Sequence, residues 1–304
     1  MALQASGSDA SDEATGIPGP TAVVIPAHDE ERRIAATVRA AGVLDGVDLV
    51  VVVDDGSRDR TVETAAEAGA IVVRHGRNRG KAAAMETGAA AVAAIDAREG
   101  RDKPDTAHLL LFLDADLEES AANAAVLIAP VRNGEAAMTI AVLPPQKRAG
   151  GGHGFVVRAS REGIRKASGF EATQPLSGQR CLTREAFDAA LPLAAGFGVE
   201  TGLTIDLVRR GFAVREVEVD LHHRVTGKDW AAQVHRARQY AHVARALAER
   251  GAAGALPGAV HGKPSPVDAD AAGNARSDSP SDSPSDAQAE TQADPRSGRT
   301  GAGS

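Results

Sequence analysis

Residues 108–118 read H-L-L-L-F-L-D-A-D-L-E, so five large apolar residues run directly into two aspartates. An unbroken apolar run of this length is typical of a strand that is covered on both faces of a parallel sheet. Asp114 and Asp116 follow where the backbone leaves the sheet, so both side chains can reach one site. Two carboxylates this close repel each other unless a cation compensates their charge. Mg²⁺ or Mn²⁺ accepts one or two carboxylates together with phosphate oxygens, so the segment predicts a metal site.

The same alternation of apolar runs and helical patterns extends through the first half of the chain. Strands are predicted at 21–26, 48–53, 70–74 and 108–113, and helices near 30–42, 60–68, 80–95 and 119–133. Strand–helix–strand repetition predicts an α/β fold with a parallel sheet and right-handed crossovers. Ligands of such sheets bind at the carboxyl ends of the strands, so the residues that follow each strand are the candidates for function.

Composition excludes several classes of protein. The net charge of −7 argues against a general nucleic-acid binder, which needs a basic surface. Cys181 is the only cysteine, so an intrachain disulfide and a thiolate metal cluster are excluded. The N-terminus lacks a signal-peptide pattern, and no apolar run approaches the roughly 20 residues of a membrane-spanning helix. These features predict a soluble, cytoplasmic protein.

The two ends of the chain are predicted to be disordered. Residues 1–20 are small, polar and acidic, and 251–304 are rich in Ala, Gly, Ser, Asp and Pro. Neither segment can bury enough apolar surface to offset its ordering entropy. The segment 251–304 is either a regulatory or docking tail or a solvated extension without a function, and both interpretations stay open. A single catalytic domain is expected at 21–250, with a donor half at 21–135 and an acceptor half at 136–250.

Four successive strand ends carry polar or charged clusters. They read P-A-H-D-E-E (26–31), D-D-G-S-R-D (54–59), R-H-G-R-N-R-G-K (74–81) and D-A-D (114–116). In a parallel sheet these clusters converge on one edge. No G-x-G-x-x-G follows the first strand, which excludes a dinucleotide fingerprint, and the spacing of Gly76 and Gly80, with Ala82 after Lys81, excludes a P-loop.

Together these segments resemble the family-2-type glycosyltransferases with the GT-A fold. The resemblance rests on V-V-I-P-A-H-D-E-E, V-V-V-V-D-D-G-S-R-D-R-T, N-R-G-K-A-A-A and L-F-L-D-A-D, and it covers roughly residues 21–250. It implies a mostly parallel sheet flanked by helices, a UDP- or GDP-linked sugar donor, and Mg²⁺ or Mn²⁺. The nucleotide-sugar contacts that it implies are Pro26, Ala27, Glu30, Asp55, Gly80, Lys81 and Asp114. It also implies that Asp114 and Asp116 are metal ligands.

A catalytic role for Lys81 and Asp116 agrees with the chemistry of such a transfer. Negative charge develops on the β-phosphate of the leaving nucleotide, and a lysine or a metal aimed at that charge stabilises the transition state. An exposed lysine near a helix start is the alternative for Lys81.

In the second half, the resemblance gives roles to Glu200 and to a histidine segment. Glu200 in G-F-G-V-E-T-G-L matches the acceptor-side acid, a general base in inverting members. A helix-start acid that complements the helix dipole is the alternative. In D-L-H-H-R-V-T-G (220–227), His223 matches a metal ligand and Arg224 an acceptor contact, with His222 as the substitute for His223.

G-V-E-T-G-L, V-D-L-H-H-R and P-L-S-G-Q-R (175–180) also resemble the glucosyl-3-phosphoglycerate synthases. This likeness implies acceptor contacts at Gly178, Arg180 and Thr183. Q-R-C-L-T and H-H-R depart from the pattern, so substrate and stereochemistry stay open. Those enzymes retain the anomeric configuration whereas most family-2 enzymes invert it, and in a retaining enzyme Glu200 binds acceptor or metal.

Two basic segments have alternative interpretations. The basic residues of 155–166 either coat a helix or face a phosphorylated acceptor. The amphipathic helix predicted at 230–247 either packs against the domain or a second subunit, as in a homodimer, or contacts an anionic membrane surface. The last arrangement suits a polyprenyl-phosphate acceptor.

The sequence therefore predicts a metal-dependent glycosyltransferase that acts on a small phosphorylated or lipid-phosphate acceptor. A sugar nucleotidyltransferase is one alternative, but the G-x-G-T-R-type loop that it needs after the first strand is absent. A non-catalytic nucleotide-sugar-binding protein is the other.

Overall fold

The computed structural model describes residues 19–101, 103–144, 153–221 and 230–252. The tails predicted to be disordered lie almost entirely outside these ranges, and so do His222, His223 and Arg224. The boundaries of the predicted catalytic domain and of its two halves stay a prediction.

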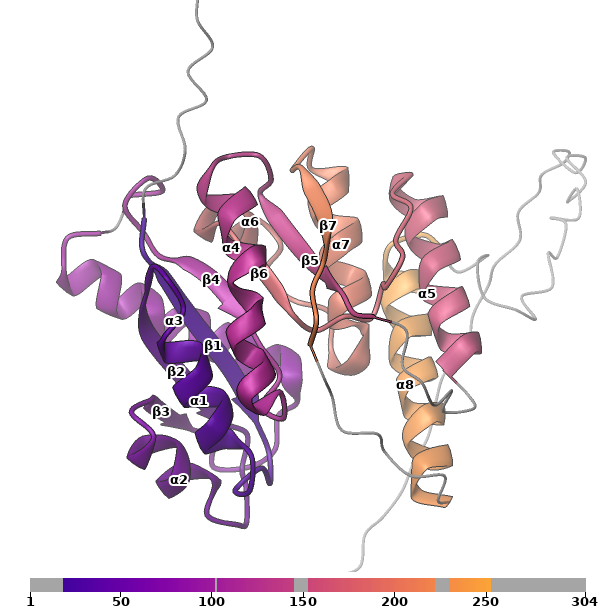
Figure 1. The fold of residues 1–304 in the computed structure, drawn as a ribbon. Helices are drawn as coiled ribbons and strands as arrows, with labels where there is room; N and C mark the ends of the chain where they lie inside the picture. The colour runs from indigo at the N-terminus through magenta and orange to yellow at the C-terminus, as the bar shows by residue number, and fades with distance from the viewer. Residues whose placement is uncertain (1–18, 102, 145–152, 222–229, 253–304) are drawn as a thin grey trace, which may run out of the picture. The chain divides into compact units, whose positions relative to one another are not determined.

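Within the described residues, seven strands form one mixed sheet in the order β3-β2-β1-β4-β6-β5-β7 (Figure 1). The strands are β1 (Thr21–Ala27), β2 (Val47–Asp54), β3 (Ile71–Arg74), β4 (Leu109–Phe112), β5 (Met138–Val142), β6 (Arg180–Leu182) and β7 (Val214–Glu218). The four predicted strands are β1 to β4, and they pair in parallel as expected. β6 runs antiparallel to both β4 and β5, whereas β5 and β7 are parallel.

Helices cover both faces of the sheet (Figure 1). They are α1 (Ile34–Gly42), α2 (Thr61–Glu67), α3 (Lys81–Arg98), α4 (Ala125–Arg132), α5 (His153–Ser168), α6 (Arg184–Ala189), α7 (Val199–Arg209) and α8 (Trp230–Glu249). Two 3₁₀ segments, η1 (Glu118–Ala124) and η2 (Gly196–Gly198), lead into α4 and α7. The predicted α/β fold, a mostly parallel sheet flanked by helices, is confirmed.

The central strand β1 explains the unbroken apolar runs of the sequence. Val23 and Ile25 point into a core formed with α1 and α4, and Ala22 and Val24 point into a second core formed with α3, α6 and α7. All four are fully buried. Because successive side chains of a strand point to opposite faces, a strand between two cores needs apolar residues at every position.

The helices α5, α7 and α8 share a third, smaller core, which includes Val156, Ile205, Val243 and Leu247. None of the helices in the described part of the chain combines the length and apolarity needed to cross a bilayer.

At the edge of the sheet opposite the predicted site, a buried histidine links three elements by hydrogen bonds. His108 precedes β4, and its ring lies between two carboxylates, with Nδ1 2.5 Å from Asp96 Oδ1 and Nε2 2.8 Å from Asp48 Oδ1. Asp96 belongs to α3 and Asp48 to β2, so one side chain joins three elements.

We expect His108→Phe to lower the free energy of unfolding by about 3–5 kcal/mol, because it leaves the buried Asp96 carboxylate without its imidazole partner. Urea denaturation measures this loss. Arg245→Ala, which removes an exposed ion pair with Glu249, is the control and should leave the urea midpoint unchanged. A His108→Phe midpoint equal to that of the control would contradict the role of His108.

The single cysteine provides a second test of the core. Cys181 in β6 is fully buried, and burial raises the pKa of its thiol from 9.0 to about 12. The unfolded chain therefore releases this proton before the folded chain does, and the thiol's contribution to stability is lost as the pH rises from about 9 toward 12. We expect the urea midpoint of the wild type to fall more between about pH 8 and 10 than that of Cys181→Ala. Equal pH slopes would show that the thiol is not buried.

Candidate active site

A lysine joins two carboxylates from distant parts of the chain at the carboxyl edge of the sheet. Lys81, the first residue of α3, places Nζ 2.7 Å from Asp114 Oδ1 and 3.1 Å from Glu200 Oε1. Asp114 follows β4, and Glu200 is the second residue of α7. Gln179 donates from Nε2 to the other oxygen of Asp114 at 2.6 Å. Three predicted site residues thus meet within direct contact.

The charge of Lys81 is set by these neighbours. Burial opposes the charged form, but Asp114 and Glu200 outweigh it and hold the pKa of Lys81 above its ordinary value. The side chain is still 28% exposed, so the cluster is not fully enclosed by protein. The cluster therefore consists of one lysine cation in contact with two carboxylates.

The loop that leads into α3 is organised by Asp55. One oxygen of Asp55 accepts from the backbone N–H of Arg79 at 2.8 Å and lies 2.7 Å from His75 Nδ1, and the other accepts from Gly80 N at 2.7 Å. Burial alone would raise the pKa of Asp55, but these donors outweigh it and lower the pKa. Gly80 adopts a φ of +90°, which a side chain would disfavour. Asp55 thereby fixes the turn that presents Lys81, and its direct contact with a nucleotide stays a prediction.

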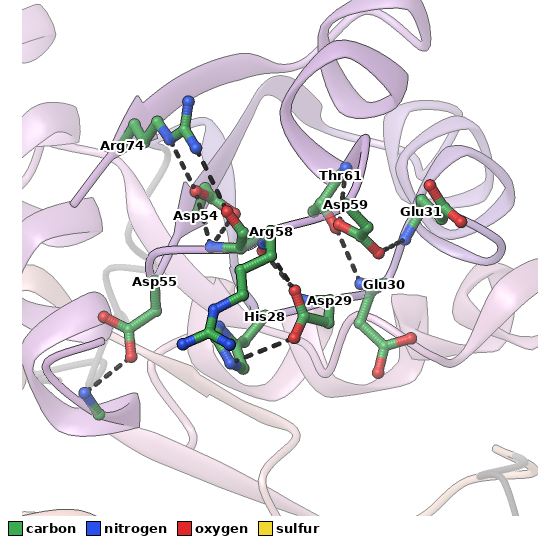
Figure 2. A network of polar contacts seen from close by, with 12 residues as sticks. His28, Asp29, Glu30, Glu31, Asp54, Asp55, Arg58, Asp59, Thr61 and Arg74 are labelled. Atoms are coloured by element: carbon green, nitrogen blue, oxygen red, sulfur yellow. Dashed lines mark hydrogen bonds and ion pairs between the residues drawn. The ribbon is translucent and has the colours of Figure 1, made fainter. Parts of the chain in front are cut away.

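The loops after β1 and β2 are tied to each other by backbone and side-chain hydrogen bonds (Figure 2). Asp29 N donates to Ser57 Oγ at 2.9 Å, and Arg58 N donates back to Asp29 Oδ1 at 2.8 Å. Glu30 N donates to Thr61 Oγ1 at 2.8 Å. These hydrogen bonds fix the position of the loop after β1 relative to the loop after β2.

The predicted nucleotide contacts at the end of β1 lie in this cross-tied region. Ala27 is buried and Pro26 is half-buried, and the carboxylate of Glu30 pairs with Arg33 at 2.7 Å. Their contact with a donor is not tested by these distances and stays a prediction.

A cavity of roughly 880 Å³ opens between the ends of β1, β2 and β3. Three arginines, Arg58, Arg74 and Arg77, contribute to its wall together with His28 and His75. Arg74 is held in place, since its Nε lies 3.4 Å from the buried carboxylate of Asp54. A cationic cavity of this size suits a ligand of the dimensions of a nucleotide.

Gly178 lies against the lysine cluster, and its contact with an acceptor stays a prediction. A Cβ at this position would fall 2.4 Å from Lys81 Nζ and 2.9 Å from Asp114 Oδ1. Only a glycine lets this loop approach the two charged groups so closely. Gln179, which contacts Asp114, was not predicted as a site residue, although its neighbours Gly178 and Arg180 were.

Acceptor contacts were also predicted for Arg180 and Thr183, and the structure describes the surroundings of both. Arg180 is fully buried, and its guanidinium donates to Ser177 O at 2.9 Å, Thr204 Oγ1 at 2.9 Å and Pro175 O at 3.3 Å. Burial lowers its pKa to about 10, so it is still a cation at neutral pH. Arg180 supports the loop that carries Gly178 and Gln179, and its contact with an acceptor stays a prediction.

Thr183 lies toward the edge of the sheet where β4 begins, and its contact with an acceptor stays a prediction. β6 is antiparallel to β4, so the chain runs from Arg180 toward the edge where β4 begins. The Thr183 hydroxyl caps α6 by accepting from Ala186 N at 3.1 Å.

The basic face of α5 is engaged in local contacts, as the helix-coat interpretation expects. Arg158 donates to Gly154 O, Arg161 donates to Thr173 O at 2.7 Å, and Arg165 pairs with Glu162.

The donor set at the end of β4 fits a hard divalent cation. Asp114 and Asp116 are both half-buried and offer only carboxylate oxygens. In the ranges that the structure covers, no three or more His, Cys, Asp and Glu side chains gather into a metal-binding group. Mg²⁺ needs only one or two carboxylates when phosphate and water complete its coordination, so the pair is sufficient. His223, the predicted third ligand, lies outside the described residues.

We expect Gly178→Ala to separate donor binding from folding. The new methyl group meets Lys81 Nζ and the Asp114 carboxylate, which are the ends of two side chains, so we expect them to shift while the strands and helices stay folded. These atoms are the ones predicted to hold phosphate and metal, so affinity for UDP with Mn²⁺ should fall about tenfold or more. Calorimetric titration and thermal melting measure the two effects.

Gly154→Ala is the matched control, because a Cβ there meets nothing within 4 Å. Full nucleotide affinity in Gly178→Ala would show that the cluster lies away from the donor.

Comparison with known proteins places the chain among sugar transferases. The profile of "Glycosyl transferase family 2" matches residues 22–167. Glycosyltransferase AglJ of Haloferax volcanii is 30% identical in a 226-residue alignment that covers 70% of this chain and 67% of that protein. The glucosyl-3-phosphoglycerate synthase of Mycolicibacterium paratuberculosis is 30% identical in a 211-residue alignment that covers 62% of this chain and 60% of that one.

Solved structures agree with the sequence relatives. The glucosyl-3-phosphoglycerate synthase of Mycobacterium tuberculosis, in complex with Mn²⁺, UDP and glucosyl-3-phosphoglycerate, superimposes with a TM-score of 0.62 at 28% identity, covering 81% of this chain and 84% of that one. The same enzyme with Mg²⁺ and UDP gives a TM-score of 0.63 at 27% identity, covering 81% and 83%.

Proposed function

The chain belongs to glycosyl transferase family 2 and is a nucleotide-sugar glycosyltransferase, and from this premise we propose that it transfers a hexose from a UDP-linked donor to a small phosphorylated acceptor with the aid of Mg²⁺ or Mn²⁺. The observation that carries the proposal is the contact of Lys81 with both Asp114 and Glu200. It brings the predicted donor side and acceptor side together at one cation.

On the donor side, Lys81 binds the diphosphate and stabilises the negative charge that develops on the β-phosphate as the sugar departs. Asp114 and Asp116 would hold the divalent cation, which when bound neutralises part of the same charge. The arginine-lined cavity beside this cluster accepts the nucleoside. Support for the donor comes from the M. tuberculosis enzyme, which was crystallised with UDP-glucose and Mn²⁺.

On the acceptor side, Glu200 acts at the hydroxyl that attacks the sugar. Its carboxylate is paired with Lys81 at 3.1 Å. When a diphosphate takes over the lysine, this carboxylate is released toward the acceptor. In an inverting transfer it removes the proton of the hydroxyl, and in a retaining transfer it binds and orients the acceptor.

A phosphorylated acceptor is favoured over a lipid phosphate by the nature of the relatives. Two of the M. tuberculosis structures contain glucosyl-3-phosphoglycerate and phosphoglyceric acid respectively, each a small anion. The family assignment sets aside the alternatives of a sugar nucleotidyltransferase and of a non-catalytic binding protein.

We expect UDP with Mn²⁺ to stabilise the wild type by about 2.7 kcal/mol at a hundredfold excess over Kd, and expect Asp116→Ala to abolish this gain. The reason is that the diphosphate is held partly through the cation. Thermal melting with and without EDTA measures the effect, and transfer from UDP-glucose to 3-phosphoglycerate tests the acceptor. The control is Asp188→Ala, whose side chain is 48% exposed on α6. Metal-dependent stabilisation that survives in Asp116→Ala would refute the metal site.

A further inference from the structure

The glycine-rich segment 196–202, which contains Glu200, packs against α8. Gly196 and Gly198 in η2 lie directly against α8: a Cβ on Gly196 would fall 2.2 Å from His242 Nδ1, and one on Gly198 would fall 2.7 Å from the His242 carbonyl oxygen. A Cβ on Gly202 would lie 3.0 Å from the guanidinium of Arg250. The glycines of G-F-G-V-E-T-G therefore permit a close contact between this segment and α8.

His242 makes the directed part of this contact. The backbone N–H of Phe197 donates to His242 Nδ1 at 3.2 Å. The Phe197 ring stacks on the imidazole, with ring centres 5.8 Å apart and an angle of 24° between the planes. Nδ1 must be the unprotonated nitrogen to accept this bond. Phe197 precedes Glu200 by three residues, so the bond holds the chain just before the first turn of α7.

Contacts that do not involve His242 also hold α8 and Arg250, the residue that follows it, in place. Arg250 donates from Nε to Asp206 Oδ1 at 2.9 Å, and its Nη2 pairs with the other oxygen of that carboxylate. Val243 and Leu247 are fully buried in the core shared with α5 and α7. Removal of the His242 acceptor therefore takes away this hydrogen bond to the segment before Glu200 without detaching α8.

We propose that His242 is a positioning residue for transfer: it fixes the Phe197 backbone, and through it holds the first turn of α7 so that the Glu200 carboxylate stays against Lys81. The effect on transfer rests on the role proposed above for Glu200. The effect on the backbone does not, because it follows from the hydrogen bond alone.

Two substitutions at His242 isolate the acceptor atom. His242→Phe keeps an aromatic ring for Phe197 to stack on but removes the acceptor. His242→Asn loses the ring but places Oδ1 at the position of Nδ1 and restores an acceptor. Arg245→Ala is the matched control on the same helix, since Arg245 contacts only Glu249 among the interactions described for its side chain.

The first measurement is amide hydrogen exchange of the segment 196–200, which needs no substrate. We expect exchange at Phe197 to be about tenfold faster in His242→Phe than in wild type, and near wild type in His242→Asn and Arg245→Ala. The second is transfer from UDP-glucose to 3-phosphoglycerate. We expect kcat to fall about tenfold in His242→Phe with KM for UDP-glucose unchanged, and to recover to within about twofold in His242→Asn.

Glu200→Gln in the same assay separates the two proposals. Full transfer by Glu200→Gln refutes the proposed role of Glu200, and hydrogen exchange then still decides whether His242 holds the segment. Loss of transfer in Glu200→Gln, together with wild-type exchange and kcat in His242→Phe, overturns the His242 proposal alone. Equal impairment of His242→Asn and His242→Phe also overturns it, because the acceptor atom would then be irrelevant.

Discussion

The ammonium group of Lys81, held between Asp114 and Glu200, is the interaction on which the site depends. Without a cation between them, these two carboxylates would face each other across the carboxyl edge of the sheet. At an effective dielectric constant near 20, each contact contributes several kcal/mol of attraction before desolvation is subtracted. A diphosphate that binds Lys81 replaces carboxylate oxygens by phosphate oxygens. The protein thus keeps the lysine charged and oriented before any ligand arrives.

The position of that lysine is set by backbone groups more than by side-chain packing. Asp55, at the end of β2, accepts from two consecutive N–H groups of the loop before α3 and so determines where α3 begins. The loop after β1 is tied to the loop after β2 in the same manner. The strands are buried between two cores and are therefore fixed in position. These hydrogen bonds fix the loops at the strand ends relative to one another, and with them the residues at the edge of the sheet.

The first half of the fold and of the site could be predicted from the sequence because its signals are local. Each apolar run is a complete strand, and each strand end carries its polar cluster within a few residues. The second half could not be predicted in the same way. β6 has only three residues, and its antiparallel direction sends Thr183 to the far edge. Arg180 carries a charge that suggests exposure, but carbonyl and hydroxyl oxygens satisfy it inside the protein. Gln179 has no sequence signal of its own, and its role depends on the position of Asp114.

The glycine-rich segment before Glu200 shows why the acceptor side is harder to predict than the donor side. Its acid is recognisable from the family resemblance, but its glycines serve contacts with α8, which lies about forty residues further along the chain. The family profile ends at residue 167, so it includes Lys81, Asp114 and Asp116 but neither Glu200 nor α8. The residues predicted to bind the diphosphate and the metal therefore lie inside the span that the family profile matches. The placement of Glu200, the predicted acceptor-side carboxylate, depends on packing beyond residue 167, so under the proposed function acceptor choice can change there without any change in the residues that bind the donor.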